Sequence, residues 1–230
     1  MSAINVFCAG AVKSALIEAL REFEQHSGHT VQCTFGSTGS LRSKIVAGEL
    51  ADIILMSRSP VEQLAHQGRV LADTIADVGR VGVGVAVRAN AALPDVSTPD
   101  ALRASLRAAR SITFGDPSKG DSSGIHFAKV IETLGIKDEL SDKIVLAPLG
   151  LAVAELIDQG KVELGATQAT VILACNGIVL AGLLPEGLQH ITTYALGVVS
   201  DSGVLPAAHN LADYLAAPAA KACFRAAGFA

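Results

Sequence analysis

The feature that most constrains this chain is a regular alternation of short apolar stretches with amphipathic helical segments. Residues 4–8, 31–35 and 51–56 have the apolar or alternating pattern of strands, and a segment of helical spacing follows each of them. In the first such segment, Ala15 and Ala19 fall on one apolar face. Strands that alternate with helices form parallel βαβ units. The first third of the chain therefore predicts an α/β sheet flanked by helices.

The same alternation resumes after a glycine-rich extended stretch at residues 81–87. Turn residues and helical spacing again separate the apolar runs, so we expect a second α/β series. The expected strands are residues 111–114, 144–146, 162–165 and 191–199, and the expected helices are residues 101–109, 125–134, 151–158, 168–175, 205–215 and 219–227.

This order predicts two α/β lobes, each a mixed, mostly parallel sheet flanked by helices. Lobe 1 contains residues 1–80 and 192–230, and lobe 2 contains residues 81–191. The chain would therefore pass between the lobes twice. We expect the hinge at these crossings and the ligand in the cleft between the lobes.

Composition narrows the class of function. Half of the 230 residues are apolar and 17% are charged, which excludes a disordered chain. A net charge of −4, an aromatic content of 4% and the absence of Trp argue against a nucleic-acid partner. No apolar run approaches the length of about 18 residues that a spanning helix needs, so we expect no membrane insertion.

The chain begins directly on its first apolar stretch and shows no export signal, so we expect a cytoplasmic protein, or a periplasmic one if a signal has been removed. Its cysteines lack the spacing of a zinc site, and a chain of this length needs no disulfide for stability. We expect four free thiols and no metal site; the cysteines are Cys8, Cys33, Cys175 and Cys223.

The candidate functional residues lie in loops that follow a strand and open a helix. In an α/β sheet the ligand crevice lies outside the carboxyl ends of the strands. Helix starts offer unpaired N–H groups to an anion, and small or hydroxylated residues let it approach. The same residue types also serve as ordinary caps and turns. Four such loops in two lobes favour an anion site formed by Gly10, Ala11, Ser37, Thr38, Gly39, Ser123, Gly124 and Gly150.

Several of these segments resemble the molybdate-binding protein family, the two-lobed type II solute-binding proteins of ABC transporters. The resemblance covers essentially the whole chain, and it implies closure of two lobes on a small anion, with an ABC permease as partner if the protein is exported. The matching segments are FCAGAV at residues 7–12, FGSTGSL at 35–41, ADIIL at 51–55, GDP at 115–117 and LGATQ at 164–168.

The resemblance also assigns individual positions. The family's first oxyanion-binding serine falls on Ala11, which has no hydroxyl, and its second falls on Thr38, which keeps one. The backbone donors of lobe 2 fall near Ser123 and Gly150, and the ligand-binding tyrosine falls on Gln168. A planar carboxylate would suit this set of donors at least as well as molybdate.

An enzymatic alternative comes from the same branch of the fold, which includes proteins resembling aconitate isomerase. These move a proton and a double bond in a tricarboxylate without metal or cofactor, which requires a base close to an acidic C–H. His126 lies inside a candidate ligand loop and is the base we would test first, with Lys13 or Asp121 as alternatives. A structural role for His126 and a solvated helix position for Lys13 stay open; Lys13 could equally face a multivalent anion.

The favoured function is specific binding of a small oxyanion or carboxylate, as in a solute-binding protein, without a cofactor. The alternative is a cofactor-independent isomerase of a small di- or tricarboxylate. A ligand sensor ranks last, because no output domain is visible in the sequence.

Overall fold

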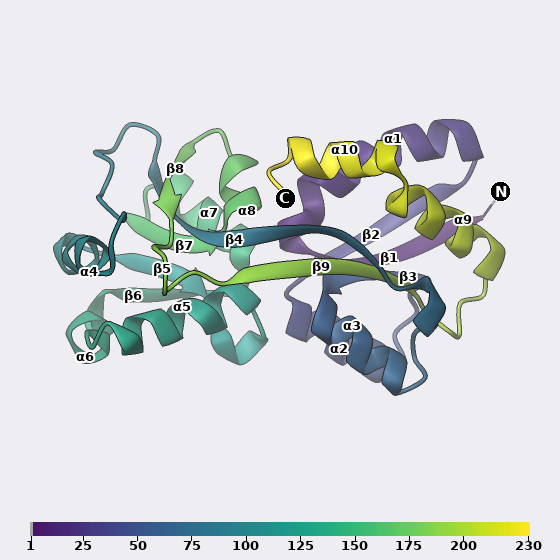
Figure 1. Cartoon of the computed structure of the whole chain (residues 1–230), viewed down its shortest axis with the longest axis horizontal. Coiled ribbons are helices and arrows are strands. Elements are labelled where there is room, and N and C mark those ends of the chain that lie inside the picture. Colours follow the sequence, from purple (N-terminus) through teal and green to yellow (C-terminus); the bar gives the residue numbers. More distant parts are fainter. Residues whose placement is uncertain (1) are drawn as a thin grey trace. The chain divides into compact units, whose positions relative to one another are not determined.

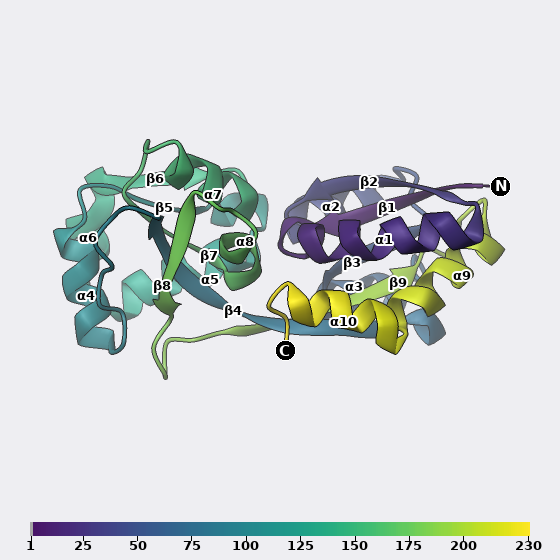
Figure 2. The ribbon, with the colours of Figure 1, turned by 90° about the horizontal axis from the view of Figure 1, so that it is seen from above.

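The structure, a computed structural model, describes residues 2–230 and contains two compact units (Figure 1, Figure 2). Unit 1 comprises the chain up to Arg80 together with Thr192–Ala230, and unit 2 is Val81–Ile191. The chain leaves unit 1 within strand β4 (Ala76–Arg88) and returns at the start of β9 (Ile191–Val198).

The sheet of unit 1 has the strand order β2-β1-β3-β9, with β9 antiparallel to β3 and the other pairs parallel. Ala9 lies opposite Gly36, and Cys8 lies opposite Leu55. The three parallel strands therefore end at the same edge of the sheet. Their bounds are β1 (Ala3–Ala9), β2 (Thr30–Gly36) and β3 (Ile53–Ser57).

Helices cover both faces of this sheet: α1 and α10 lie on one face and α2 and α3 on the other (Figure 1). Helix α1 buries Leu16 and Phe23 and ends at Gly28, whose φ of 69° is the left-handed conformation that glycine adopts without strain. The helices are α1 (Lys13–Ser27), α2 (Thr38–Val46), α3 (Arg58–His66), α9 (Leu205–Ala216) and α10 (Pro218–Ala226), with short 3-10 turns η1 (Gly10–Val12) and η2 (Ala72–Thr74).

The sheet of unit 2 has the order β4-β7-β5-β6, with β8 (Ile178–Leu183) paired to β4. Strands β5, β6 and β7 are parallel, and β4 is antiparallel to β7. Gly115 lies opposite Ala147, and Phe114 lies opposite Ala166, so these parallel strands also end at one edge. Their bounds are β5 (Ile112–Gly115), β6 (Ile144–Ala147) and β7 (Leu164–Gln168).

Helix α5 covers one face of the unit 2 sheet, and α7 and α8 cover the other (Figure 1). Phe127 of α5 is fully buried and packs edge-on against Phe114 of β5, with 5.4 Å between ring centroids. The helices are α4 (Pro99–Ala108), α5 (Ser122–Thr133), α6 (Lys137–Leu140), α7 (Gly150–Asp158) and α8 (Ala169–Leu173), with 3-10 turns η3 (Pro117–Lys119) and η4 (Ser141–Lys143).

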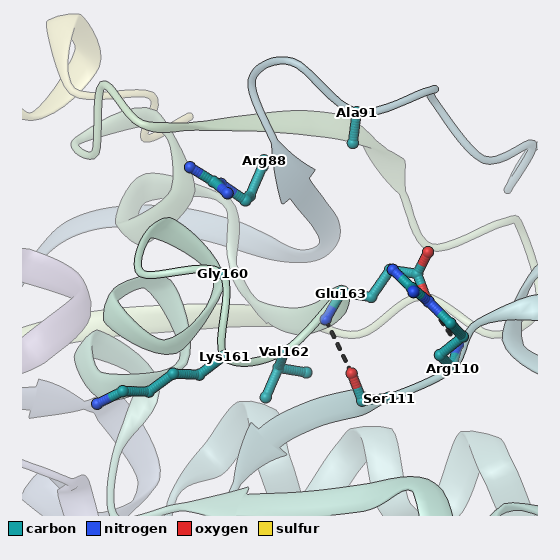
Figure 3. Close-up of a pocket in the computed structure, with 8 residues that line it drawn as sticks. All are labelled: Arg88, Ala91, Arg110, Ser111, Gly160, Lys161, Val162 and Glu163. Atoms are coloured by element: carbon teal, nitrogen blue, oxygen red, sulfur yellow. Dashed lines mark hydrogen bonds and ion pairs between the residues drawn. The ribbon is translucent and has the colours of Figure 1, made fainter.

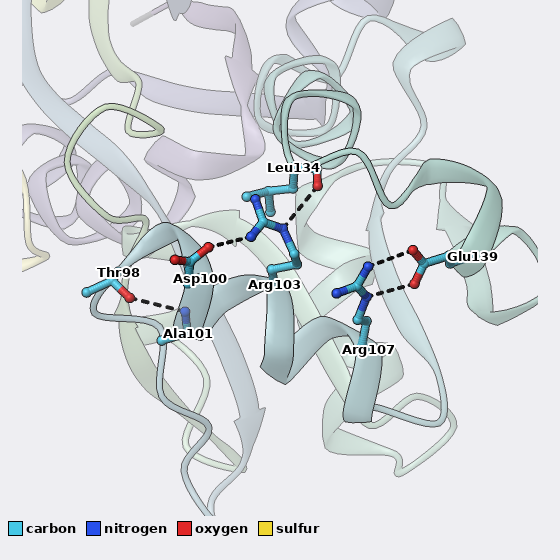
Figure 4. Close-up of polar contacts among 7 residues, drawn as sticks. All are labelled: Thr98, Asp100, Ala101, Arg103, Arg107, Leu134 and Glu139. Carbon is cyan, nitrogen blue, oxygen red and sulfur yellow. Dashed lines mark hydrogen bonds and ion pairs between the residues drawn. The ribbon is translucent and has the colours of Figure 1, made fainter.

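Polar contacts attach α4 to its neighbours, as Figure 4 shows. Thr98 caps the helix by accepting a hydrogen bond from the Ala101 amide, at 3.1 Å. Arg107 forms a bidentate pair with Glu139 of α6, with both N–O distances at 2.7 Å. Arg103 bonds to Asp100 and donates to the carbonyl of Leu134, at 3.1 Å. These exposed pairs orient α4 more than they stabilise it.

Most expected elements are confirmed, but two boundaries in unit 2 were predicted wrongly and two of its elements were not predicted. Helix α5 begins at Ser122 rather than at residue 125, because Asp121 caps it by accepting from the Gly124 amide. Strand β7 continues to Gln168, where we expected a helix to begin, and neither strand β8 nor the short helix α6 was predicted.

The four cysteines are free, with Cys8 buried. Burial raises the pKa of the Cys8 thiol well above its ordinary value, and its proximity to Cys33 adds to this. Among the described residues, no helix has both the length and the hydropathy that crossing a membrane requires.

Candidate functional site

The residues predicted for lobe 1 gather at the carboxyl edge of the unit 1 sheet. Gly10 and Ala11 form the turn η1 directly after β1, and Ser37, Thr38 and Gly39 open helix α2 directly after β2. Because β1 and β2 end in register, these two loops are neighbours. We call this group, together with Ser57 at the end of β3, the unit 1 edge.

Hydroxyl groups dominate the unit 1 edge. The Thr38 and Ser57 hydroxyl oxygens lie 3.2 Å apart and share a hydrogen bond, and both residues are buried. The Ser37 hydroxyl caps α2 by accepting from the Ser40 amide, at 3.1 Å. A hydroxyl such as that of Thr38 or Ser57 can make more than one hydrogen bond. Such neutral groups, placed at the start of a helix, suit a small anion.

Sequence reasoning missed Ser57. Helix α3 begins at Arg58, and Ser57 is its N-cap. The signal that could have found Ser57 is its position: it is the first polar residue after the apolar run of residues 53–56, and it caps the next helix as Ser37 caps α2.

Lys13 lies beside the unit 1 edge. Its ammonium nitrogen is 5.3 Å from the centroid of the Phe35 ring, near the end of β2, which is the distance of a cation–π contact. The side chain is exposed at the first position of α1, while Ala11 is buried and has no polar side-chain group. The structure therefore places this cation at the start of α1, two residues after Ala11.

The residues predicted for lobe 2 gather at the carboxyl edge of the unit 2 sheet, and the carboxylate of Asp121 connects them. One carboxylate oxygen, Oδ1, accepts from the Ser123 hydroxyl at 2.7 Å and from the Gly124 amide at 2.8 Å. The other oxygen, Oδ2, accepts from the Gly150 amide at 2.9 Å. One buried acidic side chain thus bonds to the start of α5 and to the start of α7.

Glycines make this arrangement possible. A side-chain carbon on Gly115, the last residue of β5, would lie 2.3 Å from the Asp121 carboxyl carbon. A side-chain carbon on Gly124 would lie 1.8 Å from the carbonyl oxygen of Gly115. Both contacts are impossible for real atoms, so only glycine lets α5 start this close to the strand.

Thr167 is a second residue that sequence reasoning missed, because we expected its strand to end at residue 165. Its side chain is fully buried near the end of β7, and its hydroxyl oxygen has no hydrogen-bond partner among the described residues. A methyl group on Gly150 would lie 2.6 Å from this oxygen, 3.6 Å from Asp121 Oδ2 and 3.9 Å from the Ser123 hydroxyl. We call this group of Asp121, Ser123, Gly124, Gly150 and Thr167 the unit 2 edge.

Gln168 and His126 flank this group. Gln168 is buried at the end of β7, opposite Val83 of β4. The His126 Nε2 atom lies 2.7 Å from the Leu188 carbonyl oxygen and must carry a proton to bond to it, which leaves Nδ1 for proton transfer. The His126 ring centroid lies 5.1 Å from that of His190. Desolvation lowers the pKa of His190, and repulsion from His126 and Lys129 lowers it further.

A cavity of about 440 Å³ lies at the opposite end of the unit 2 strands (Figure 3). Ser111 and Glu163, at the amino ends of β5 and β7, line it together with Arg88, Arg110 and Lys161. Its arginine side chains lie at different ends of the cavity and do not converge (Figure 3). None of the predicted site residues lines this cavity.

Over residues 2–230, no group of three or more His, Cys, Asp or Glu side chains is arranged to hold a metal ion.

The fold is the two-lobed type II fold of the periplasmic binding proteins. The chain shares it with the periplasmic molybdate-binding protein of Azotobacter vinelandii, at a TM-score of 0.85 and 21% identity over 99% of this chain and 98% of that one. The chain belongs to the family of bacterial extracellular solute-binding proteins, whose family model matches residues 4–230.

Two curated relatives align with nearly the full length of the chain. Aconitate isomerase from a Pseudomonas species is 28% identical, over 96% of this chain and 86% of the relative. The molybdate-binding protein ModA of Escherichia coli is 26% identical, over 98% of this chain and 88% of the relative. One relative is named for catalysis and the other for binding, so family membership leaves the roles of the individual site residues as predictions.

Proposed function

We propose that this protein binds a small anion, an oxyanion or a small carboxylate. The observation that carries the proposal is the pair of polar edges: each unit ends its parallel strands in glycines, hydroxyls and helix starts. Open α/β sheets bind ligands at this edge. The molybdate-binding relative and structural neighbour support an anion as the ligand.

A partner follows from the family. Solute-binding proteins of this kind deliver their ligand to a membrane permease, so we propose an ABC permease as partner if the protein is exported. The cytoplasmic location expected from the sequence stays a prediction, and fractionation of the source cells tests it.

Isomerisation of a small di- or tricarboxylate is the second candidate. Aconitate isomerase is the more similar of the two curated relatives described above. His126 is adjacent along α5 to the donors of the unit 2 edge, and its Nδ1 atom is the nitrogen left to move a proton. The enzyme would need no cofactor, because proton transfer requires only a base and donors that stabilise the enediolate.

A thermal-shift screen separates binding from no binding. The panel pairs molybdate, tungstate, sulfate and phosphate with citrate, cis- and trans-aconitate and short dicarboxylates. A ligand at about 100 times its dissociation constant adds about 2.7 kcal/mol of stability, which is a clear rise in Tm. If no anion on the panel raises the Tm, the proposal is wrong.

Proton NMR of each stabilising carboxylate then separates a receptor from an enzyme. A receptor returns its ligand unchanged, whereas an isomerase produces a second set of signals. His126→Ala should abolish the conversion and leave a receptor's affinity within about twofold. Conversion that persists in His126→Ala would remove His126 from the mechanism.

A further inference from the structure

The turn between α8 and β8 contains the one asparagine of this chain that a glycine follows, in the pair Asn176-Gly177. The Cys175 carbonyl accepts from the Ile178 amide at 3.4 Å, so this pair occupies the two central positions of a β-turn. Asn176 is exposed, and its carboxamide makes no hydrogen bond within residues 2–230. The side chain is therefore free to rotate toward the backbone that follows it.

The backbone amide of Gly177 is also free. Its N–H has no acceptor in the part of the chain that the structure describes, although the Gly177 carbonyl accepts from the Ala89 amide at 3.0 Å. Glycine has no side chain to shield this nitrogen. An amide outside any hydrogen bond exchanges its proton with water and base more readily than a bonded one. A nucleophilic nitrogen and a free side-chain carbonyl thus lie on neighbouring residues.

A second asparagine, on a neighbouring turn, provides the contrast. Asn90 is as exposed as Asn176 and directly follows Ala89, which bonds to Gly177. The residue after it is Ala91, whose amide donates to the Arg88 carbonyl at 2.9 Å. Arg88 and Ala91 are labelled in Figure 3. Asn90 therefore has the exposure of Asn176 but lacks a free nitrogen beside it.

We propose that Asn176-Gly177 is a site of spontaneous deamidation, which the chain undergoes without an enzyme. The deprotonated Gly177 nitrogen attacks the side-chain carbonyl carbon of Asn176 and forms a C–N bond that closes a succinimide ring. The bond from that carbon to the side-chain nitrogen breaks, and this nitrogen takes up the proton and leaves as ammonia. Water then opens the ring at either carbonyl, which gives aspartate or isoaspartate with no change of oxidation state. Asparagine is among the thermolabile residues of proteins.

The surroundings of the turn determine what the modification does. The Asp158 carboxylate packs so closely against Gly177 that a side-chain carbon on this glycine would collide with it. Ile178, the next residue, is opposite Arg88 in the β4–β8 pair. Isoaspartate adds one carbon to the main chain directly before this pair, and both products add a negative charge near Asp158. We therefore expect the isoaspartate form to lose the pairing of β8 and to unfold at a lower temperature.

Incubation of the full-length protein at 37 °C, followed by peptide mapping with mass spectrometry, tests the proposal. Asn176 should convert progressively to aspartate and isoaspartate, while Asn5, Asn90 and Asn210 keep their amides. The initial rate should rise about tenfold from pH 7.5 to pH 8.5, because the fraction of deprotonated amide rises tenfold with each pH unit. If Asn176 keeps its amide as long as Asn90 does, the proposal is wrong.

Two substitutions at the same position separate the chemistry from its consequence. Asn176→Gln has a longer side chain that would close a larger ring, so its acidic form should not accumulate on anion exchange. Asn176→Asp carries the charge of the product on a main chain of normal length. The isoaspartate fraction of the wild-type protein should have a lower Tm than Asn176→Asp. Equal Tm values would overturn the expected loss of β8 pairing.

Ala91→Gly is the matched control, because it creates a second Asn-Gly pair on the neighbouring turn. The amide of residue 91 donates to Arg88, so Asn90 in this variant should convert much more slowly than Asn176 in the same molecule. Equal rates at the two positions would show that the dipeptide alone decides, and would overturn the role assigned to the free Gly177 amide.

Discussion

The two units present the same architectural edge and satisfy its polar groups in different ways. In unit 1, the hydroxyls of Thr38 and Ser57 bond to each other and the Ser37 hydroxyl accepts from the Ser40 amide, so only neutral groups are involved. In unit 2, the carboxylate of Asp121 receives the corresponding donors. The comparison teaches that a helix start at the end of a parallel strand is not in itself a vacant anion site, because a side chain of the chain itself can fill it.

The largest expected effect comes from removing the internal carboxylate. Asp121→Ala leaves the Ser123 hydroxyl and the amides of Gly124 and Gly150 without an acceptor and deprives α5 of its cap. We expect a loss of about 3 kcal/mol in the free energy of unfolding, at about 1 kcal/mol for each bond. Urea denaturation followed by circular dichroism measures this.

Asp95→Ala is the control for this substitution, because Asp95 makes the same kinds of hydrogen bond at an exposed turn where water replaces them. Its loss of stability should be much smaller. Equal losses from the two variants would mean that Asp121 is no more than an ordinary turn residue.

A smaller effect is expected at the unit 1 edge. Ser57→Ala removes the hydrogen-bond partner of the buried Thr38 hydroxyl and should cost about 1 kcal/mol. It should also weaken anion binding about tenfold, because a donor is lost at the edge. Titration calorimetry and urea denaturation measure the two effects. Ser43→Ala is a suitable control, since the Ser43 hydroxyl bonds within α2 on its exposed side; a loss of affinity in this variant would contradict the assignment.

How far the sequence predicts this molecule depends on whether an interaction is local. The strands expected at residues 4–8 and 31–35, and the helical segments expected after them, follow from residues close together in the sequence, and the structure confirms them. The bond from Gly150 to Asp121 joins residues 29 apart, on different βα units, and no local pattern reports it. The sequence therefore identified Ser123, Gly124 and Gly150 as donors without showing where their hydrogen bonds go.

Sequence reasoning missed two residues that lie at the ends of strands. Ser57 is the last residue of β3 and Thr167 is the second-last residue of β7. At such a position, a shift of one residue in the predicted boundary decides whether a side chain is assigned to the sheet or to the site. Apolar patterning places such boundaries only within a few residues. Thr167 lies in LGATQ, a segment that we had divided between a strand and a helix, so its burial in the sheet was not foreseen.

Removal of an unpaired hydroxyl should stabilise unit 2. Thr167→Val and Thr113→Val each replace a buried hydroxyl that lacks a partner with a methyl group of similar size. Each should raise the free energy of unfolding by up to about 1 kcal/mol, because the desolvation cost of the hydroxyl disappears. Differential scanning calorimetry on the ligand-free protein measures the rise in Tm. An unchanged or lowered Tm in both variants would contradict this desolvation cost.

The smallest expected effect is a pH dependence that belongs to unit 2. His190 has a lowered pKa in the folded protein, through desolvation and repulsion from His126 and Lys129, so the unfolded chain binds its proton at a higher pH. The contribution of His190 to the free energy of unfolding is therefore fully present above about pH 6.5, the ordinary pKa of histidine, and is lost as the pH falls below it. Because His190 is largely exposed, the fall in Tm between pH 7.5 and pH 5 should be only about 1–2 °C.

The carboxylates of Asp95 and Asp116 hold their charge through this range, since hydrogen bonds from Ser97 and Ser118 lower their pKa. His190→Gln should flatten the profile, whereas His209→Gln, on α9 of unit 1, should leave it unchanged. Parallel profiles for wild type and His190→Gln would place the acid sensitivity elsewhere in the protein and remove this distinction between the units.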